Sequence, residues 1–288
     1  MNLRDVKHRI LSVKSTQKIT SAMKLVASAK LRKAQAAIES MRPYGHKLGH
    51  IMAELLSCAG ESKTPFIAER EPKRVAIVAV ASDTGLCGSF NANMIALMRE
   101  TVASYRQKGI EVEIYTAGRK MHDAVKRDGF EPDTSLLEQA GAPVYGTVAD
   151  VASRLMERFA NGEIDRVDVV YPNFVTASGN VPTRETLLPV DITAMLSDET
   201  ECECDYIMEP GSDELIAVLL PKTITLSLFT VLLSSAAAEH AARMIAMQLA
   251  TDNADDLIAE LTLEYNKGRQ QAITNELLDI TAGSAGTL

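Results

Sequence analysis

The sequence predicts an α/β protein that carries a long α-helical coiled coil, with antiparallel N- and C-terminal helices and a central Rossmann-like domain built on a parallel sheet. Three observations lead to this prediction. A heptad register of apolar residues runs through residues 1–58, and a similar register runs through residues 212–288. Between them, strand-like and helix-like segments alternate over residues 73–195.

The N-terminal segment, residues 1–58, reads as one long helix. Apolar residues recur at alternating spacings of three and four, which predicts a coiled coil with a left-handed twist. At about 1.5 Å per residue, a helix from Asn2 to Cys58 would be roughly 85 Å long. Pro43 and Gly45 should bend or loosen it locally. The seam positions are Leu3, Val6, Ile10, Val13, Gln17, Thr20, Lys24, Ala27, Leu31, Ala34, Ile38, Met41, Gly45, Leu48, Met52 and Leu55.

This seam is polar over one short stretch, at Gln17, Thr20 and Lys24. There the apolar residues Ile19, Met23 and Val26 fall on a neighbouring face. Apolar side chains that point outward beside a polar seam indicate a surface covered by a partner. The alternative is a local shift in the packing of the two helices.

The C-terminal segment, residues 212–288, repeats the seam pattern and has an Ala-rich middle that allows close helix packing. Two long terminal helices with matching seams should pair antiparallel, because the intervening domain returns the chain to its start. Pro221 is the main irregularity, and it marks a possible start of the straight helix. The seam includes Leu226, Leu233, Ala237, Met244, Met247, Ala254, Ile258, Leu261, Tyr265 and Ala272.

The central segment, residues 73–195, alternates strands and helices, which predicts a small parallel sheet. The Val-rich run at 74–81 is typical of a strand buried on both faces. Further strands are expected at 111–117, 166–171 and 185–189, and helices at 90–105, 120–127 and 148–159. Residues 196–211 form an acidic connecting loop.

Composition leads us to expect a cytoplasmic chain whose membrane association runs only through partners. The longest uncharged stretch, Thr223 to Ala238, is shorter than the ~20 apolar residues that a bilayer requires, and Ser and Thr interrupt it. Charged residues occupy the place of a signal peptide's apolar region. The four cysteines, Cys58, Cys87, Cys202 and Cys204, are too few and too irregular for a disulfide framework and are expected to be free thiols.

The net charge of −8 is unevenly distributed. Residues 1–42 carry ten Lys or Arg against two acidic residues, and residues 197–214 carry eight acidic residues and no basic one. Such blocks mark surfaces for charged partners, or simply solvated faces. A nucleic-acid partner is disfavoured because the whole protein is acidic and the basic stretch lacks interleaved aromatic residues.

Two motifs invite a chemical role. The loop Ser82–Ser89 follows a strand and precedes a helix, a position where backbone amides can bind phosphate. Its glycine spacing matches neither the dinucleotide fingerprint nor the Walker loop, so a tight strand-to-helix turn is the alternative. His46 and His50 lie four apart and could bind a metal in principle, but no Glu is placed as in a metalloprotease helix. No pattern indicates a catalytic constellation.

Several motifs together resemble one known family. The first helix carries TQKIT (16–20), AMKLV (22–26) and RPY (42–44), and the centre carries DTGLCG (83–88). The last helix carries EHAARMIAM (239–247), ATDNA (250–254), YNK (265–267), RQ (269–270) and ITNEL (273–277). In this order, and over essentially the whole chain, they resemble the gamma subunits of F-type ATP synthases.

The resemblance implies a rotor shaft that catalyses nothing itself. It implies a coiled coil standing inside a ring of alternating alpha and beta subunits, and a foot that rests on the membrane c-ring and holds the epsilon subunit. Rotation of the shaft would couple proton or sodium flow to ATP synthesis or hydrolysis on beta. The resemblance implies no cofactor and no metal, and a peripheral location on the cytoplasmic side of a bacterial inner membrane.

The resemblance also assigns residues to contacts. Lys18, Ile19 and Met23 match the stretch that faces the beta subunits, where a basic helix would meet an acidic segment. A second contact with beta matches Arg269, Gln270 and Thr274, followed by an apolar tail at 273–280 that would sit in a bearing. The foot contacts with epsilon and the c-ring match Tyr206 and Glu209.

Some positions depart from the family pattern. Ala238 stands where a Ser is usual, and the tail at 281–286 (TAGSAG) lacks the apolar residue that many relatives have first, so bearing packing should be looser. The inserted dithiol switch of chloroplast-type subunits has no counterpart here. Cys202 and Cys204 lie in the acidic loop instead, which puts redox regulation in doubt.

Overall fold

The computed structural model describes residues 3–58, 64–68, 70–176, 179–191, 209 and 211–285. They divide into two compact units. One comprises Ser28–Arg243 and is called the α/β unit here, and the other, called the coil unit, comprises Met1–Ala27 and Met244–Leu288. Two helices run through both units: α1 (Leu3–Cys58) and α6 (Ser212–Ala285).

The α/β unit contains a four-stranded sheet in the order β2-β1-β3-β4. The strands are β1 (Arg74–Val80), β2 (Glu111–Ala117), β3 (Arg166–Thr176) and β4 (Gly179–Leu188). The helices between them are α2 (Phe90–Gln107), α3 (Arg119–Arg127), the short 3-10 helix η1 (Leu137–Gln139) and α4 (Tyr145–Ala160). Each strand and helix that the sequence predicts in this region is present, with ends that differ by a few residues.

The sheet is mixed rather than fully parallel, which corrects the sequence prediction. β1 pairs in parallel with β2 and β3, whereas β4 pairs antiparallel with β3. β4 begins three residues after β3 ends, and so short a connection permits only an antiparallel hairpin, because a parallel crossover requires a dozen or more residues. The strand expected at 185–189 is therefore the second half of a longer edge strand.

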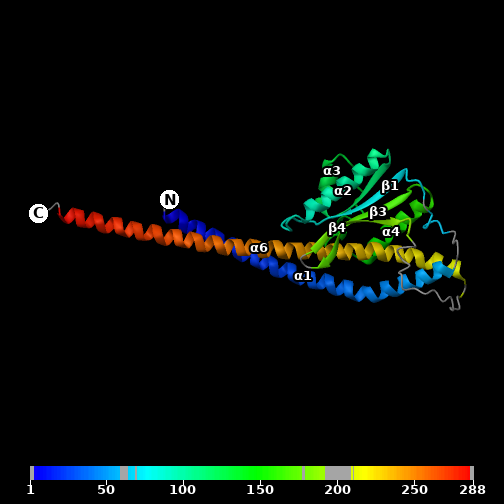
Figure 1. The fold of residues 1–288 in the computed structure, drawn as a ribbon, viewed down its shortest axis with the longest axis horizontal. Helices are drawn as coiled ribbons and strands as arrows, with labels where there is room; N and C mark the ends of the chain where they lie inside the picture. Colours follow the sequence, from blue (N-terminus) through cyan, green and yellow to red (C-terminus); the bar gives the residue numbers. More distant parts are fainter. Residues whose placement is uncertain are drawn as a thin grey trace. The chain divides into compact units, whose positions relative to one another are not determined.

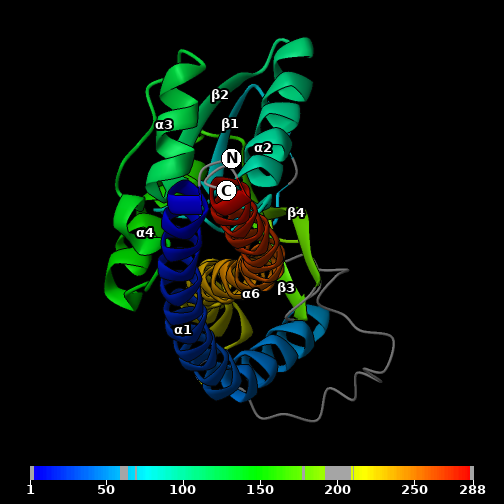
Figure 2. The ribbon, with the colours of Figure 1, turned by 90° about the vertical axis from the view of Figure 1, so that its left-hand side faces the viewer.

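Alternate side chains of β1 point into two separate cores. Val75, Ile77 and Ala79 pack with α2 and α3 on one face of the sheet. Ala76 and Val78 pack with α4, α6 and the end of α1 on the other face. Figure 1 shows α2 and α3 on the side of the sheet away from α4 and α6, and Figure 2 views the same layers along the helices. Because both faces are covered, β1 is apolar throughout, as the sequence indicates.

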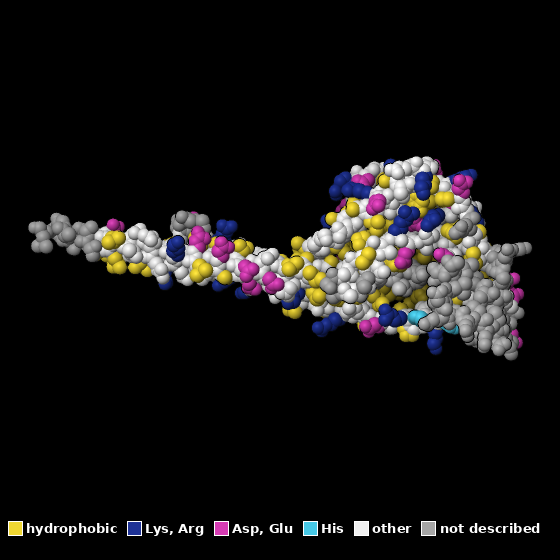
Figure 3. Space-filling view, viewed as in Figure 1, with side chains coloured by type: hydrophobic (Ala, Val, Ile, Leu, Met, Phe, Trp, Pro, Cys, Tyr) yellow, Lys and Arg dark blue, Asp and Glu magenta, His cyan; other side chains and the backbone are white. Residues whose placement is uncertain are grey.

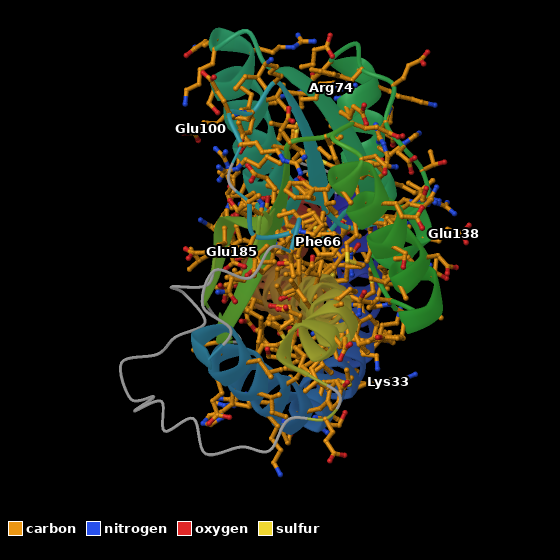
Figure 4. The ribbon with its side chains drawn as sticks, turned by 90° about the vertical axis from the view of Figure 1, so that its right-hand side faces the viewer. Lys33, Phe66, Arg74, Glu100, Glu138 and Glu185 are labelled. Atoms are coloured by element: carbon orange, nitrogen blue, oxygen red, sulfur yellow. The ribbon has the colours of Figure 1, made fainter. Side chains whose placement is uncertain are left out.

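Interior and periphery of this unit differ as expected for a packed domain. Phe66 lies inward against the core shared with α6, and its carbonyl accepts a hydrogen bond from the Val190 amide at 2.9 Å. The charged side chains of Glu100, Glu138 and Glu185 lie at the outside, as Figure 4 shows.

Two prolines lie inside helices without ending them. α1 continues through Pro43, and α6 begins at Ser212 and continues through Pro221, so Pro221 does not mark the start of the helix. The hydroxyl of Thr225 donates to the Pro221 carbonyl at 2.9 Å. α6 is anchored on both sides of Pro221 by buried residues such as Leu220 and Ile224, which offsets the cost of the missing amide donor.

α6 is long and apolar over much of its length. By length and composition, this helix contains a window apolar enough to cross a membrane, although 56% of that window is buried inside the protein. Its buried residues include Leu228, Phe229 and Leu232, which belong to the core beneath the sheet. Packing in a protein core therefore accounts for the apolar character of the helix.

In the coil unit, α1 and α6 pair antiparallel. Partners run in opposite directions along the two helices: Leu3 lies against Gly268, and Thr20 lies against Thr251. Buried residues of the seam include Val6 on α1 and Leu261 on α6. The heptad pattern thus predicts the pairing, and the return of the chain through the intervening domain predicts its direction.

Candidate partner-contact surface

The break in the first seam is a polar layer between the two helices. Gln17 Nε2 donates to Asp255 Oδ1 at 2.5 Å, and the Thr20 and Thr251 hydroxyls lie 2.9 Å apart. One turn further on, Lys24 Nζ donates to Gln248 Oε1 at 2.5 Å. Apolar seam residues continue in the same register on either side, at Val6 and Ala27. The polar stretch is therefore paired across the seam, which argues against a local shift in packing.

Beside this layer, large apolar side chains point away from the partner helix. Ile19 is 57% exposed and Leu25 is 66% exposed on α1, and Leu249 and Leu263 are 59% and 73% exposed on α6. Figure 3 shows hydrophobic side chains at the surface along the coil, between charged ones. Several large apolar side chains exposed along one helical pair are consistent with a surface that binds another protein.

The first group of predicted contact residues lies on this surface. Lys18 and Ile19 are exposed, and Met23 is half-buried. The charge of Lys18 thus lies beside an apolar side chain, a combination suited to a protein surface with both acidic and apolar groups.

The second group lies elsewhere on the coil. Arg269, Gln270 and Thr274 are all exposed on α6, just beyond Gly268, the residue that faces Leu3 near the start of α1. At about 1.5 Å per residue, Arg269 lies about 20 Å along the helix from Asp255, the partner of Gln17. The structure therefore does not bring the two groups together, and α6 presents the second group where its pairing with α1 ends.

The apolar tail and the foot residues complete the predicted set. Ile273, Leu277 and Ile280 are exposed, so the tail offers an apolar surface. Glu209 is exposed, whereas Tyr206 lies outside the described residues, as do Cys202 and Cys204.

The loop Ser82–Ser89 is a strained turn whose polar groups are largely bonded within the loop and to α2. Leu86 and Gly88 adopt left-handed conformations, with φ of 63° and 62°. The Ser82 amide donates to Asn91 Oδ1 at 3.1 Å, and the Ser82 hydroxyl oxygen lies 2.8 Å from the same atom. The Asn91 amide group also donates to the Cys87 sulfur at 3.2 Å. These contacts favour the tight-turn interpretation of the glycines.

The sequence did not reveal that this loop is also bound from α6. Arg243 donates to the Thr84 hydroxyl at 2.9 Å, and its other nitrogen donates to Glu239 at 2.5 Å. Because Arg243 and Thr84 are far apart in the sequence, no local sequence pattern predicts their contact. The one available signal is the Glu-x-x-x-Arg spacing of 239–243, which predicts a pair on one helix face.

A buried ionic cluster links β3, β4 and α2. The carboxylate of Asp168, fully buried, accepts from Tyr105 Oη at 2.6 Å, from Arg184 at 2.8 Å and from Arg166 at 2.9 Å. Thr186 donates to it as well, at 3.2 Å. Burial, with the hydrogen bond to Asp168, raises the pKa of Tyr105 to about 12. Four donors of the chain itself occupy this carboxylate, so the cluster is suited to holding the sheet together rather than to proton transfer.

Metal ligands are not assembled within the part of the chain that the structure describes. No group of three or more His, Cys, Asp or Glu side chains in the described ranges could hold an ion. His50 instead lies 3.4 Å from Glu54, one turn further along α1.

Fold and surface together define a class of protein: an α/β domain in a chain whose long terminal helices pair antiparallel and expose apolar side chains suited to partners. Comparisons with known proteins name the family. A family description, ATP synthase, matches residues 2–286. The ATP synthase gamma chains of Bacteroides thetaiotaomicron and Phocaeicola vulgatus are 50% and 51% identical, and each alignment covers 98% of this chain and 99% of the relative. The chain belongs to the ATP synthase gamma chain family, as its motifs predict.

Solved structures agree with the fold. The central stalk and c-ring structure of the Tetrahymena thermophila mitochondrial ATP synthase contains a chain with 25% identity and a TM-score of 0.59, covering 81% of this chain and 99% of that one. A chain from the Euglena gracilis mitochondrial ATP synthase rotor matches at 18% identity and a TM-score of 0.63, covering 94% and 98%. The second match supports the fold alone, and both confirm the predicted combination of long terminal helices with a central sheet.

Proposed function

We propose that this chain is the central rotor shaft of an F-type ATP synthase, coupling ion flow through the membrane sector to ATP synthesis and hydrolysis by rotation. The observation that carries the proposal is full-length identity of about half to gamma chains of bacterial ATP synthases. The similarity to a protein solved as part of a central stalk with a c-ring supports the same role.

In this role the coil unit turns inside a ring of alpha and beta subunits. Lys18, Ile19 and Met23 form the first contact with beta, and Arg269, Gln270 and Thr274 form the second. The first contact lies on α1 beside Asp255 of α6, and the second lies about 20 Å further along α6, so one shaft can contact the ring at two levels. The planar guanidinium of Arg269 can hold a carboxylate or carbonyl of beta in a defined geometry. The exposed apolar tail from Ile273 onward turns in an apolar bearing.

At the other end, Tyr206 and Glu209 belong to the foot, which contacts the epsilon subunit and the c-ring. The chain reaches the membrane only through these partners, on the cytoplasmic side of a bacterial inner membrane. It catalyses nothing itself, and the nucleotide chemistry takes place on beta. The paired polar layer and the packed ionic cluster of Asp168 support a mechanical role, since both fix helices and strands in place.

Recovery of partners tests the assignment. The tagged chain is isolated from its native membranes, and the subunits that come with it are identified and quantified by mass spectrometry. We expect alpha and beta in equal amounts, each about threefold over this chain, together with epsilon and the c-ring. Recovery of this chain alone, or with unrelated proteins, would contradict the proposal.

A charge placed on the first contact tests the residue assignment. Met23→Lys adds a cation to the surface that faces beta, so proton pumping should fall more than ATP hydrolysis in reconstituted vesicles. Gln107→Lys adds the same charge at an exposed position of α2 and serves as the control. If pumping and hydrolysis fell in strict proportion in Met23→Lys, the assignment of this surface to coupling would be wrong.

A further inference from the structure

One side chain of α6 reaches across to the exposed loop that follows β1. Arg243 Nη2 donates to the Thr84 hydroxyl at 2.9 Å, to the Thr84 carbonyl at 3.3 Å and to the Gly85 carbonyl at 3.4 Å. Its Nη1 donates to Glu239 at 2.5 Å. A single guanidinium therefore joins a helix to the tip of a loop that lies about 160 residues earlier in the sequence.

Glu239 fixes the direction in which Arg243 points. Both side chains are largely buried, at 7% and 13% exposure, and they lie one turn apart on α6. Burial raises the pKa of Glu239, whereas the hydrogen bond and the charge of Arg243 act in the opposite direction. Removing either partner would leave the other charge buried without compensation, so the pair holds the guanidinium in one orientation.

Other contacts on the inner side of the loop hold it in position for the hydrogen bonds from Arg243. The Ser82 hydroxyl donates to the Thr84 carbonyl at 2.6 Å and the Asn91 amide donates to it at 3.4 Å, so Arg243 shares that carbonyl with two side chains of the inner face. Cys87 and Phe90 pack against Ala238 of α6, one turn before Arg243. The loop is thus seated on α6 by an apolar contact at its base and by the guanidinium at its tip.

The position of Arg243 gives this contact a mechanical meaning. Arg243 is the last residue of the α/β unit, and the coil unit resumes at Met244. The contact therefore involves the last residue of α6 that belongs to the α/β unit. Ala242, the residue before Arg243, packs against the apolar base of the loop, so loss of the guanidinium contact would free the tip of the loop while its base stays on α6.

We propose that Arg243 is a positioning residue, which clamps the loop Ser82–Ser89 to α6 and so makes this part of the α/β unit a stiff segment for the transmission of torque. The mechanical part rests on the proposed rotor function. Without the clamp, the tip of the loop would move more freely while its base stays packed on α6, and torque would pass between the loop and α6 through a softer attachment.

The test replaces Arg243 by Lys in the intact complex. Lys keeps the charge beside Glu239 but cannot donate to Glu239 and Thr84 in a planar fork. We expect hydrogen exchange of the amides of residues 84–88 to speed up about tenfold or more, because a charge-assisted hydrogen bond is lost. We also expect proton pumping per ATP hydrolysed to fall, while exchange in β1 stays unchanged.

Two further variants make the result specific. Thr84→Ala removes one acceptor of the clamp and should speed loop exchange less, and the Arg243→Lys/Thr84→Ala double variant should add little to Arg243→Lys alone. Arg99→Lys makes the same substitution in another forked pair, with Asp128, away from α6, and should leave both readouts unchanged.

The two readouts test the clamp and its mechanical role separately. Unchanged loop exchange in Arg243→Lys would overturn the clamp, and faster exchange with unchanged coupling would overturn its mechanical role. Failure of the rotor proposal is recognised separately, because the wild-type chain would then not be recovered with alpha and beta.

Discussion

His240 gives the α/β unit a dependence on pH that follows from its surroundings. The side chain is 5% exposed, and its Nδ1 has no hydrogen-bond partner among the described residues. Burial, followed by the charges of Arg243 and Lys30, lowers the pKa of His240 from its ordinary 6.5 to about 4. Between pH 6.5 and about pH 4, the imidazole of His240 therefore stays mostly neutral in the folded unit but is mostly protonated in the unfolded chain.

The sign and size of the effect follow from linkage. Because the folded pKa is depressed, stability is fully present above pH 6.5 and is lost progressively as pH falls toward about 4. Between pH 7 and pH 5, this one group should cost about 2 kcal/mol of unfolding free energy. The full loss, reached below the folded pKa, would be about 3 kcal/mol.

The assay compares the wild-type chain with His240→Gln, which cannot titrate. Gln keeps a nitrogen donor for the backbone of Gly141, the group that interacts with the imidazole. Urea unfolding at pH 7 and pH 5 is followed by tyrosine fluorescence, because Tyr105 and Tyr171 are buried in this unit. The wild type should lose about 2 kcal/mol more than the variant between the two pH values.

Comparing the two proteins isolates the histidine. Other groups, including Glu239, whose pKa is raised by burial, titrate in both proteins and cancel in the difference. Equal losses in wild type and His240→Gln would refute the reasoning, since they would show that His240 takes up its proton equally well in the folded unit.

Three further predictions concern stability. Asp168→Ala leaves the arginines of its cluster without their carboxylate and should cost about 3–5 kcal/mol in urea unfolding, so a loss below 1 kcal/mol would contradict the role of that cluster. Gly118 has a φ of +92°, and a Cβ added there would lie 2.1 Å from a backbone oxygen, so Gly118→Ala should abolish stable folding. Gly129 has a φ of +85° but open space around it, so Gly129→Ala should lower the free energy of unfolding by only about 1–2 kcal/mol, measured by thermal unfolding. Replacing Thr20 and Thr251 together by Val should raise the melting temperature of the coil, measured by circular dichroism, because a buried polar pair becomes an apolar one; a lower melting temperature would show that the polar layer stabilises the coil.

Much of the fold could be predicted because its elements carry strong local patterns. The continuous apolar run of β1 reflects burial on both faces of the sheet, and the heptads of α1 and α6 reflect a seam buried in the partner helix. β4 was predicted only in part because it is an edge strand, and polar residues such as Asn180 and Thr183 give its first half no continuous apolar signal.

Other features depend on contacts that no local pattern encodes. The polar residues Gln17, Thr20 and Lys24 interrupt the seam in the sequence, but their pairing with α6 becomes visible only when the helices are aligned. The clamp from Arg243 to Thr84 likewise depends on the α/β fold bringing distant segments together. The outward contact residues were assigned through resemblance, and the structure supplies their exposure and their spacing along the coil.

Rotation is the central claim, and a single-molecule assay tests it most directly. The alpha and beta subunits of the purified complex are fixed to a surface, a bead is attached to the α/β domain of this chain, and ATP is supplied. The account predicts continuous rotation of the bead in one direction, stopping when ATP is removed. A bead that only fluctuates in place while the same complexes hydrolyse ATP would contradict the assignment of this chain as the rotor.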